Sequence, residues 1–164
     1  MEILSEIKNR RSVRKYNDRE VTDEQIAALI EAARLAPSGS NKQPWDFIVV
    51  RSKALREKIS VIDHNQTWML TAPVFIVCIG STRYRGDGDM ERVIRDSAIA
   101  TEHILLQAEH MGLASCWTGW YDQNEMRELL NLDDDCYVIG VVTIGYTEER
   151  PSARPRRTIN YKTL

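Results

Sequence analysis

The chain has 164 residues, of which 43% are hydrophobic and 28% are charged, and its formal net charge at pH 7 is −2. This length allows one domain with a substantial core, and this composition excludes a disordered or membrane-embedded chain. No apolar run approaches the roughly 20 residues that a bilayer-spanning helix needs, and the first residues lack the basic-then-apolar order of a signal peptide. We therefore expect a single domain over residues 1–164, located in the cytoplasm.

Helices and strands are expected to alternate along the chain. Helices are expected over residues 2–9, 22–36, 55–59, 91–111 and 125–130, and strands over residues 45–50, 74–79, 113–117 and 137–146. Thr22 and Gln25 have the spacing of a capping box, so the helix that follows them is the clearest. The β-branched run over 74–79 is typical of a strand that is covered on both faces. Such interleaving predicts a three-layer α+β or α/β domain.

The expected helix over 91–111 is apolar around much of its circumference. A helix of this kind is either central or packs against a partner as well as its own sheet. The spacing does not decide between these alternatives.

Charge is distributed unevenly along the chain. Residues 8–19 contain six basic residues and one acidic residue, and residues 150–157 contain four arginines and no acidic residue. The remainder is therefore strongly acidic. Two basic segments in an acidic chain favour a local anionic ligand, with two solvated mobile ends as the alternative. A nucleic-acid partner is not expected, because the chain has no helix-turn-helix spacing and a negative net charge.

Familiar catalytic and metal-binding patterns are absent from the sequence. There is no nucleophile elbow, no phosphate-binding P-loop, no dinucleotide fingerprint and no HExxH pattern. The three cysteines are widely spaced, so no disulfide framework or zinc site is expected, and Cys78 and Cys116 are interpreted as inert core thiols. His103 and His110 share one helix face and are interpreted as ordinary hydrogen-bonded histidines rather than metal ligands.

Four other segments carry groups that suit an anion or a heteroaromatic ring. The first segment surrounds Arg10, and the guanidinium groups of its arginines match phosphate oxygens two at a time. Because side chains alternate in an extended segment, Ser12 and Arg14 can point to one side while Val13 faces the core. The loop over 37–45 is rich in amides, which both donate and accept hydrogen bonds. Small residues over 112–119 allow backbone N–H groups to approach a ligand, and residues 154–157 are basic.

Together these segments resemble the nitroreductase family of FMN-dependent NAD(P)H oxidoreductases, over nearly the whole chain. The Arg-Arg-Ser-Val-Arg opening and the Pro-Ser-Gly-Ser-Asn-Lys-Gln-Pro-Trp loop are the specific part of the match, and the Gly-Leu-Ala-Ser-Cys-Trp stretch and the basic tail follow in the right order. The resemblance implies an α+β fold, a three-layer α-β-α sandwich with a central mixed, mainly antiparallel sheet. It also implies a homodimer whose flavin sites lie at the interface between subunits.

The resemblance also assigns residues to the cofactor. The expected FMN-binding residues are Arg10, Arg11, Ser12, Arg14, Pro37, Ser38, Gly39, Asn41, Trp117, Thr118, Gly119, Arg154 and Arg156. Arg10 and Ser12 would hold the phosphate and ribityl chain, and Arg14 would support the negative charge of the reduced ring. The loop that begins at Pro37 would come from the other subunit. The spacing does not decide which tail arginine closes on the phosphate.

The implied activity is a ping-pong transfer of two electrons from NADH or NADPH, through flavin N5, to a small acceptor such as a nitroaromatic or a quinone. No protein nucleophile and no metal is expected, because the cofactor carries the chemistry. The alternatives are another flavin reaction on the same fold (dehalogenation, heterocycle dehydrogenation or flavin cleavage) and a flavin-binding protein without turnover. The chain ends soon after the basic tail, so a C-terminal exchange between subunits is expected to be short or absent.

Overall fold

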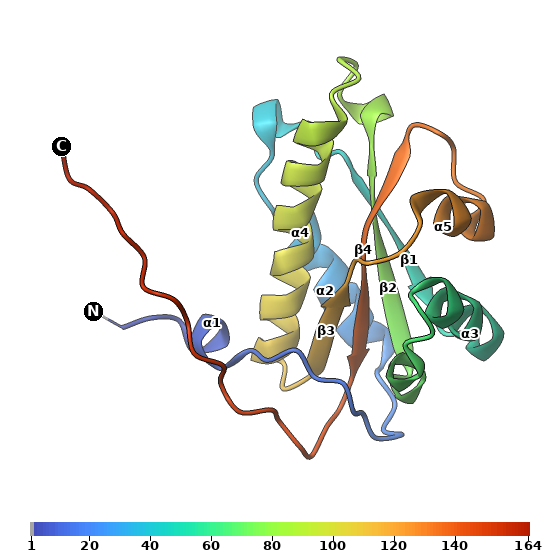
Figure 1. Cartoon of the computed structure of the whole chain (residues 1–164), viewed down its shortest axis with the longest axis vertical. Coiled ribbons are helices and arrows are strands. Elements are labelled where there is room, and N and C mark those ends of the chain that lie inside the picture. Colours follow the sequence, from blue (N-terminus) through green and yellow to red (C-terminus); the bar gives the residue numbers. More distant parts are fainter. Residues whose placement is uncertain (1) are drawn as a thin grey trace.

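The computed structural model describes residues 2–164, and its centre is a four-stranded sheet (Figure 1). The strands are β1 (Trp45–Val50), β2 (Val74–Ser81), β3 (Ala114–Thr118) and β4 (Cys136–Gly145), in the order β1-β2-β4-β3. All three neighbouring pairs are antiparallel. Among the described residues, parallel pairing is limited to a bridge between Ser12 and Ser115. The expected mainly antiparallel sheet is confirmed.

Burial follows the position of each strand in the sheet. All eight residues of β2 are buried, and the central strand β4 is buried except at Tyr137. The edge strand β1 is half exposed along its middle. The prediction that the run over 74–79 is covered on both faces is therefore confirmed, because central strands with helices on each side need apolar residues at every position.

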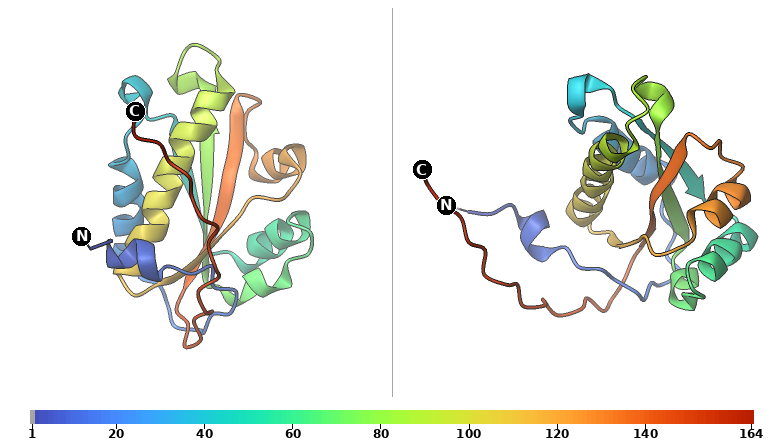
Figure 2. Two further views of the ribbon diagram at one scale, coloured as in Figure 1. Left: turned by 60° about the vertical axis from the view of Figure 1, so that its left-hand side comes forward. Right: turned by 45° about the horizontal axis from the view of Figure 1, so that its top comes forward.

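Helices cover both faces of the sheet, which gives the three layers expected from the resemblance (Figures 1 and 2). Helices α2 (Asp23–Arg34) and α4 (Met90–His110) pack on one face, and α3 (Lys53–Ile62), α5 (Gln123–Leu130) and the short η2 (Thr67–Thr71) pack on the other. Each face carries its own cluster of buried apolar side chains, one around Ile104 and one around Phe75. The sheet therefore separates two hydrophobic cores.

Helix boundaries agree with the capping residues in the sequence. Thr22 and Gln25 form the predicted capping box, and Asp122 accepts backbone N–H groups at the start of α5. The first helix, α1 (Ser5–Asn9), is shorter than the expected span over 2–9. Its N-cap residue is Leu4, and no side chain caps the first turn of this helix.

Helix α4 is only partly an internal helix. One face of this helix is buried, yet Ile99 on its other side is 41% exposed. The neighbouring α1 has no buried residue, and both its residue Ile7 and its N-cap Leu4 are exposed. Exposed apolar side chains therefore lie on both α1 and α4.

The last residues form an extended arm. No helix or strand is assigned after β4, and residues 148–164 are all exposed. The N-terminal segment and the arm leave the body on the same side (Figure 2). Over residues 2–164, every helix is too short or too polar to span a bilayer.

Candidate functional site

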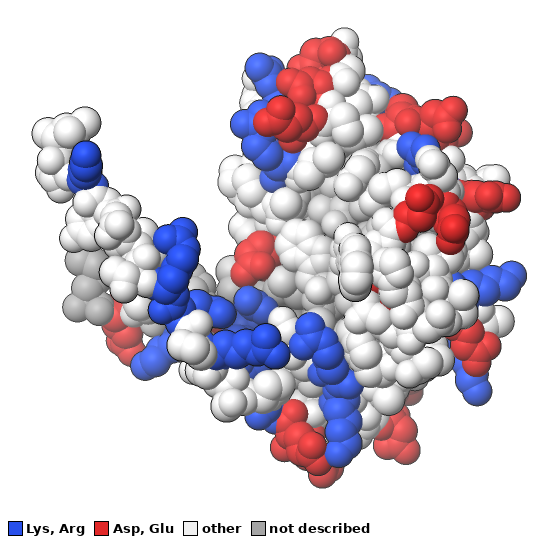
Figure 3. Space-filling view, in the orientation of Figure 1, with Lys and Arg blue, Asp and Glu red and all other residues white. Residues whose placement is uncertain are grey.

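Two basic segments that lie at opposite ends of the chain meet at one cavity of about 230 Å³. The residues that line it are Arg10, Arg11, Ser12, Arg14, Pro151, Ser152, Arg154 and Arg156. Six of the thirteen predicted cofactor-binding residues are in this set, and none of the lining residues is acidic. Figure 3 shows lysine and arginine side chains gathered where the arm crosses the body. Five guanidinium groups and two hydroxyls therefore surround a space that suits a phosphate group.

The N-terminal wall of the cavity is built as the alternation predicts. Val13 is 1% exposed and donates its backbone N–H to the carbonyl of Ser115 at the start of β3. Ser12 and Arg14 on either side are exposed. Val13 is anchored in the core, so its two neighbours must point away from it and into solvent.

Arg10 and Arg11 have different surroundings. Nε of Arg10 lies 3.8 Å from Glu102 on α4. This loose pair leaves the guanidinium able to bind a ligand. Nη1 of Arg11 instead donates to the carbonyls of Lys8 and Arg10, at 3.0 Å and 2.8 Å. Arg11 thus satisfies carbonyls at the C-terminus of α1 while it lines the cavity.

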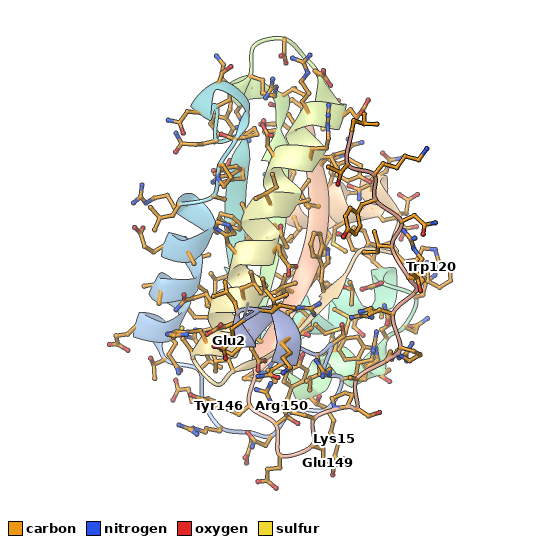
Figure 4. All side chains as sticks on the ribbon, turned by 90° about the vertical axis from the view of Figure 1, so that its left-hand side faces the viewer. Glu2, Lys15, Trp120, Tyr146, Glu149 and Arg150 are labelled. Carbon is orange, nitrogen blue, oxygen red and sulfur yellow. The ribbon has the colours of Figure 1, made fainter. Side chains whose placement is uncertain are left out.

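The arm is tied to the body at its base by two ion pairs. Lys15 Nζ lies 2.7 Å from Glu149, and Arg150 donates to both carboxylate oxygens of Glu109. Figure 4 shows Lys15, Glu149 and Arg150 together at the lower end of the molecule. Arg154 and Arg156 follow a few residues later, so the two anchors hold the arm in the position where its arginines line the cavity.

The predicted segment Trp117–Gly119 lies at the end of β3, beyond the Ser12 bridge. The Trp117 indole packs against Gly140, where a Cβ atom would overlap the ring. Its Nε1 donates to the carbonyl of Ile139 at 3.4 Å. Thr118 is buried and Gly119 is exposed, so the backbone becomes accessible at Gly119.

The predicted loop over 37–41 does not join this cavity within one subunit. Gly39 contacts Asp96 near the start of α4, whereas the arm contacts Glu109 near its end. At 1.5 Å per residue these points on α4 are about 20 Å apart. Figure 1 accordingly shows the turn η1 (Gly39–Asn41) at the opposite end of the molecule from the N-terminal segment.

Aromatic residues beside the predicted flavin-binding segments were not identified from the sequence. The Arg14 guanidinium lies 5.5 Å from the Trp68 ring centroid, and Trp68 donates to Gln66. His64 and the exposed Trp120 are in contact, with ring centroids 4.2 Å apart and ring planes tilted by 44°. No local motif marks these residues; the only signal is the position of Trp120 directly after Gly119.

The cysteines and helix histidines are satisfied structural residues, as expected. All three cysteines are free and buried, and burial raises the pKa of the Cys78 thiol to about 12. Burial also raises the pKa of Cys116, the cysteine nearest the cavity, against the opposing effect of Arg14. His103 bonds the carbonyl of Ala32, and His110 bonds Glu6. None of these groups supplies a nucleophile at the cavity.

The comparisons with known proteins agree with the fold. The Nitroreductase family model matches residues 7–65 and 61–146. A putative NADH dehydrogenase/NAD(P)H nitroreductase of Methanothermobacter thermautotrophicus is 37% identical over 159 residues, which cover 94% of this chain and 82% of the relative. An FMN reductase [NAD(P)H] of Bacillus subtilis is 30% identical, covering 94% of this chain and 70% of the relative. The chain belongs to the nitroreductase family.

A solved structure gives the same result for the fold. An FMN-dependent nitroreductase from Clostridium difficile R20291 is 33% identical and superposes with a TM-score of 0.81, covering 93% of this chain and 92% of that one. These matches confirm two predictions at the level of the family. The predicted enzyme class is an NAD(P)H-dependent FMN nitroreductase-type oxidoreductase, and the predicted cofactor is FMN.

Proposed function

We propose that this chain is a single FMN-binding domain over residues 1–164 that transfers two electrons from NADH or NADPH to a small acceptor such as a nitroaromatic or a quinone. The observation that carries the proposal is the cavity in which five arginines from the two ends of the chain converge without an acidic lining residue. A phosphate monoester is a dianion at neutral pH, and this lining fits it. When bound, FMN supplies the two-electron redox chemistry.

The cavity residues are assigned to the cofactor by their positions. Arg10, Ser12 and one of the arm arginines bind the phosphate, while Arg11 mainly holds the end of α1. Arg14 is exposed beside Trp68, farther along the segment, which suits the edge of the flavin ring. A fixed cation there stabilises negative charge that develops on the ring. Both Arg154 and Arg156 line the cavity, so both remain candidates for closing on the phosphate.

The complete site is proposed to form in a homodimer. The loop over 37–41 and the arginine cavity lie at opposite ends of α4, so one subunit alone does not bring them to one flavin. The exposed apolar surface over α1 and α4, with Leu4, Ile7 and Ile99, supplies the contact that such a dimer needs. The predicted contributions of Pro37, Ser38, Gly39 and Asn41 therefore belong to the partner's flavin.

The acceptor is proposed to bind against the indole of Trp120, which His64 contacts from the side. Trp120 is 76% exposed and directly follows Gly119 (Figure 4). The exposed indole of Trp120 offers a flat face next to the flavin segment, which favours planar acceptors over branched ones. The protein is proposed to act in the cytoplasm, because buried, unpaired cysteines suit its reducing conditions.

The test is the visible spectrum of the purified protein before and after anaerobic addition of NADH or NADPH. Flavin bands that bleach on addition are the expected result. Bands that persist would favour the flavin-binding protein without turnover, and a colourless protein that takes up no added FMN would overturn the proposal. Among other flavin reactions, flavin cleavage needs oxygen, so anaerobic turnover with a nitroaromatic separates it from the proposed activity.

A further inference from the structure

An ion pair between Arg85 and Asp96 orients the carboxylate of α4 that binds the turn η1. The Arg85 side chain is 6% exposed and that of Asp96 is 14% exposed, which is low for charged side chains. Arg85 Nη1 donates to Asp96 Oδ2 at 3.1 Å, and the Gly39 backbone N–H donates to the same oxygen at 3.2 Å. One carboxylate oxygen of α4 thus joins the turn to an arginine from the segment after β2.

Arg85 is itself fixed by a second carboxylate. Its Nε and Nη2 donate to the two oxygens of Asp87, at 3.3 Å and 3.2 Å. A guanidinium held on one edge in this two-point geometry has little freedom to rotate. Its remaining edge therefore orients Asp96 toward Gly39.

The turn that Asp96 contacts has a costly backbone conformation. Ser40, Asn41 and Gln43 all lie in the left-handed region, with φ of 54°, 55° and 48°. Residues other than glycine adopt this region at a cost and keep it only where the surroundings impose it.

Contacts from outside the turn are made at its two ends. Asp96 binds Gly39 at the entrance, and the next residue, Ser97, donates to the carbonyl of Pro44 at the exit, at 3.3 Å. Within the turn, Gln43 donates its backbone N–H to Ser38 Oγ at 2.9 Å. Two successive residues of α4 thus span the segment on which the proposed flavin contacts lie.

We propose that Asp96, oriented by Arg85, is a positioning residue that presets the shape of the 37–41 turn for the flavin of the partner subunit. This inference rests on the proposed function. Asp96 would touch neither the flavin nor the acceptor; it would remove the ordering cost that a free turn adds to FMN binding.

The experiment compares FMN affinity with apoprotein stability in the full chain. Asp96→Ala removes both hydrogen bonds, and Asp96→Asn keeps an oxygen that can accept from Gly39 while losing the charge. Glu91→Gln is the matched control, because this carboxylate lies on the same helix, is 84% exposed and pairs with Arg95 rather than with the turn. FMN affinity is read from quenching of flavin fluorescence, and stability from the melting temperature with and without FMN.

Asp96→Ala is expected to bind FMN roughly tenfold or more weakly, as the loss of a charge-assisted hydrogen bond predicts. The increase in melting temperature that FMN produces should shrink, while the melting temperature of the apoprotein changes little. The visible bands of the residual bound flavin should shift, because the turn no longer lies against the ring in its preset shape. Asp96→Asn should recover part of the affinity, and Glu91→Gln should match the wild type.

The outcomes separate this inference from the proposed function. A wild-type protein that takes up no FMN overturns both. A wild-type protein that binds FMN, together with an Asp96→Ala variant that binds it equally well, overturns the positioning role alone. The positioning role is also overturned if Asp96→Asn, which can still accept from Gly39, binds FMN as weakly as Asp96→Ala.

Discussion

Arg150 Nη1 lies 2.7 Å from Glu109 Oε1, and this contact joins the first residues of the C-terminal arm to the end of α4. The Glu109 side chain is 13% exposed, so solvent screens this pair less than an open surface pair. The arm carries no regular structure beyond this point. The position of Arg154 and Arg156 at the cavity therefore depends on how the base of the arm is held.

Glu109→Gln is expected to weaken FMN binding roughly three- to tenfold, because the arm arginines then spend less time at the phosphate. Titration of the apoprotein with FMN measures the change. Lys15→Gln is the matched control. Its pair with Glu149 anchors the same arm, but both side chains are 70% exposed, so its loss should change affinity by less than about twofold. Equal effects of the two variants would contradict the anchoring role of Glu109.

Arg10→Ala should weaken FMN binding by roughly 1.5–3 kcal/mol, the value of a hydrogen bond to a charged group. Arg11→Ala should lose less affinity, because the Arg11 guanidinium already donates to two backbone carbonyls. The apoprotein should lose more stability in Arg11→Ala than in Arg10→Ala. Paired measurements of the FMN dissociation constant and the urea midpoint test both orders. A larger affinity loss in Arg11→Ala would assign the phosphate contact to Arg11 and the structural role to Arg10.

The docking of α1 on α4 is expected to depend on pH. His110 Nδ1 lies 2.8 Å from Glu6 Oε1, and its hydrogen bond is the main cause that lowers the Glu6 pKa from 4.5 to about 2. A depressed carboxyl pKa contributes stability that is complete above about pH 4.5 and is lost as the pH falls toward 2.

Urea midpoints at about pH 6 and about pH 3 test this dependence. The wild type should lose more stability between the two conditions than Glu6→Gln, which has no charge to lose. Identical losses in the two proteins would show that the pair does not contribute.

Much of the fold could be predicted from local patterns. The buried strand over 74–79 follows from a continuous apolar run, and Thr22 with Gln25 marks the start of α2. The alternation around Val13 correctly places its neighbours on the solvent side. These features depend on residues that are close in sequence, so their physics is visible without the fold.

The parts that escaped prediction depend on distant contacts. Asp96 and Gly39 are 57 positions apart, and the segment that contains Arg85 shows only as short and rich in arginine and glycine in the sequence. The pairing of His64 with Trp120 likewise joins a loop to the end of β3. Periodicity and capping carry no information on such contacts, because only the packed sheet and α4 bring these residues together.

Gly140→Ala should destabilise the protein by roughly 1–3 kcal/mol, the usual cost of overpacking. The new Cβ atom would overlap the indole of Trp117, which lies against the backbone of Gly140. Urea denaturation measures the loss, and the near-ultraviolet circular dichroism of the tryptophan should change with it. The double variant Gly140→Ala/Trp117→Leu should recover part of the stability. Additive losses in the double variant would mean that the two side chains do not compete for one space.

Trp120→Ala is expected to raise KM for planar acceptors without weakening FMN binding. Trp120 is 76% exposed and touches His64, while the cavity arginines belong to other segments. Loss of one aromatic stacking partner corresponds to a roughly two- to tenfold rise in KM. Steady-state kinetics with a nitroaromatic and with a non-planar acceptor measure the effect, and Trp120→Phe serves as the conservative variant. A rise of equal size for both acceptors would argue against a stacking surface, and a loss of FMN affinity would place Trp120 at the cofactor instead.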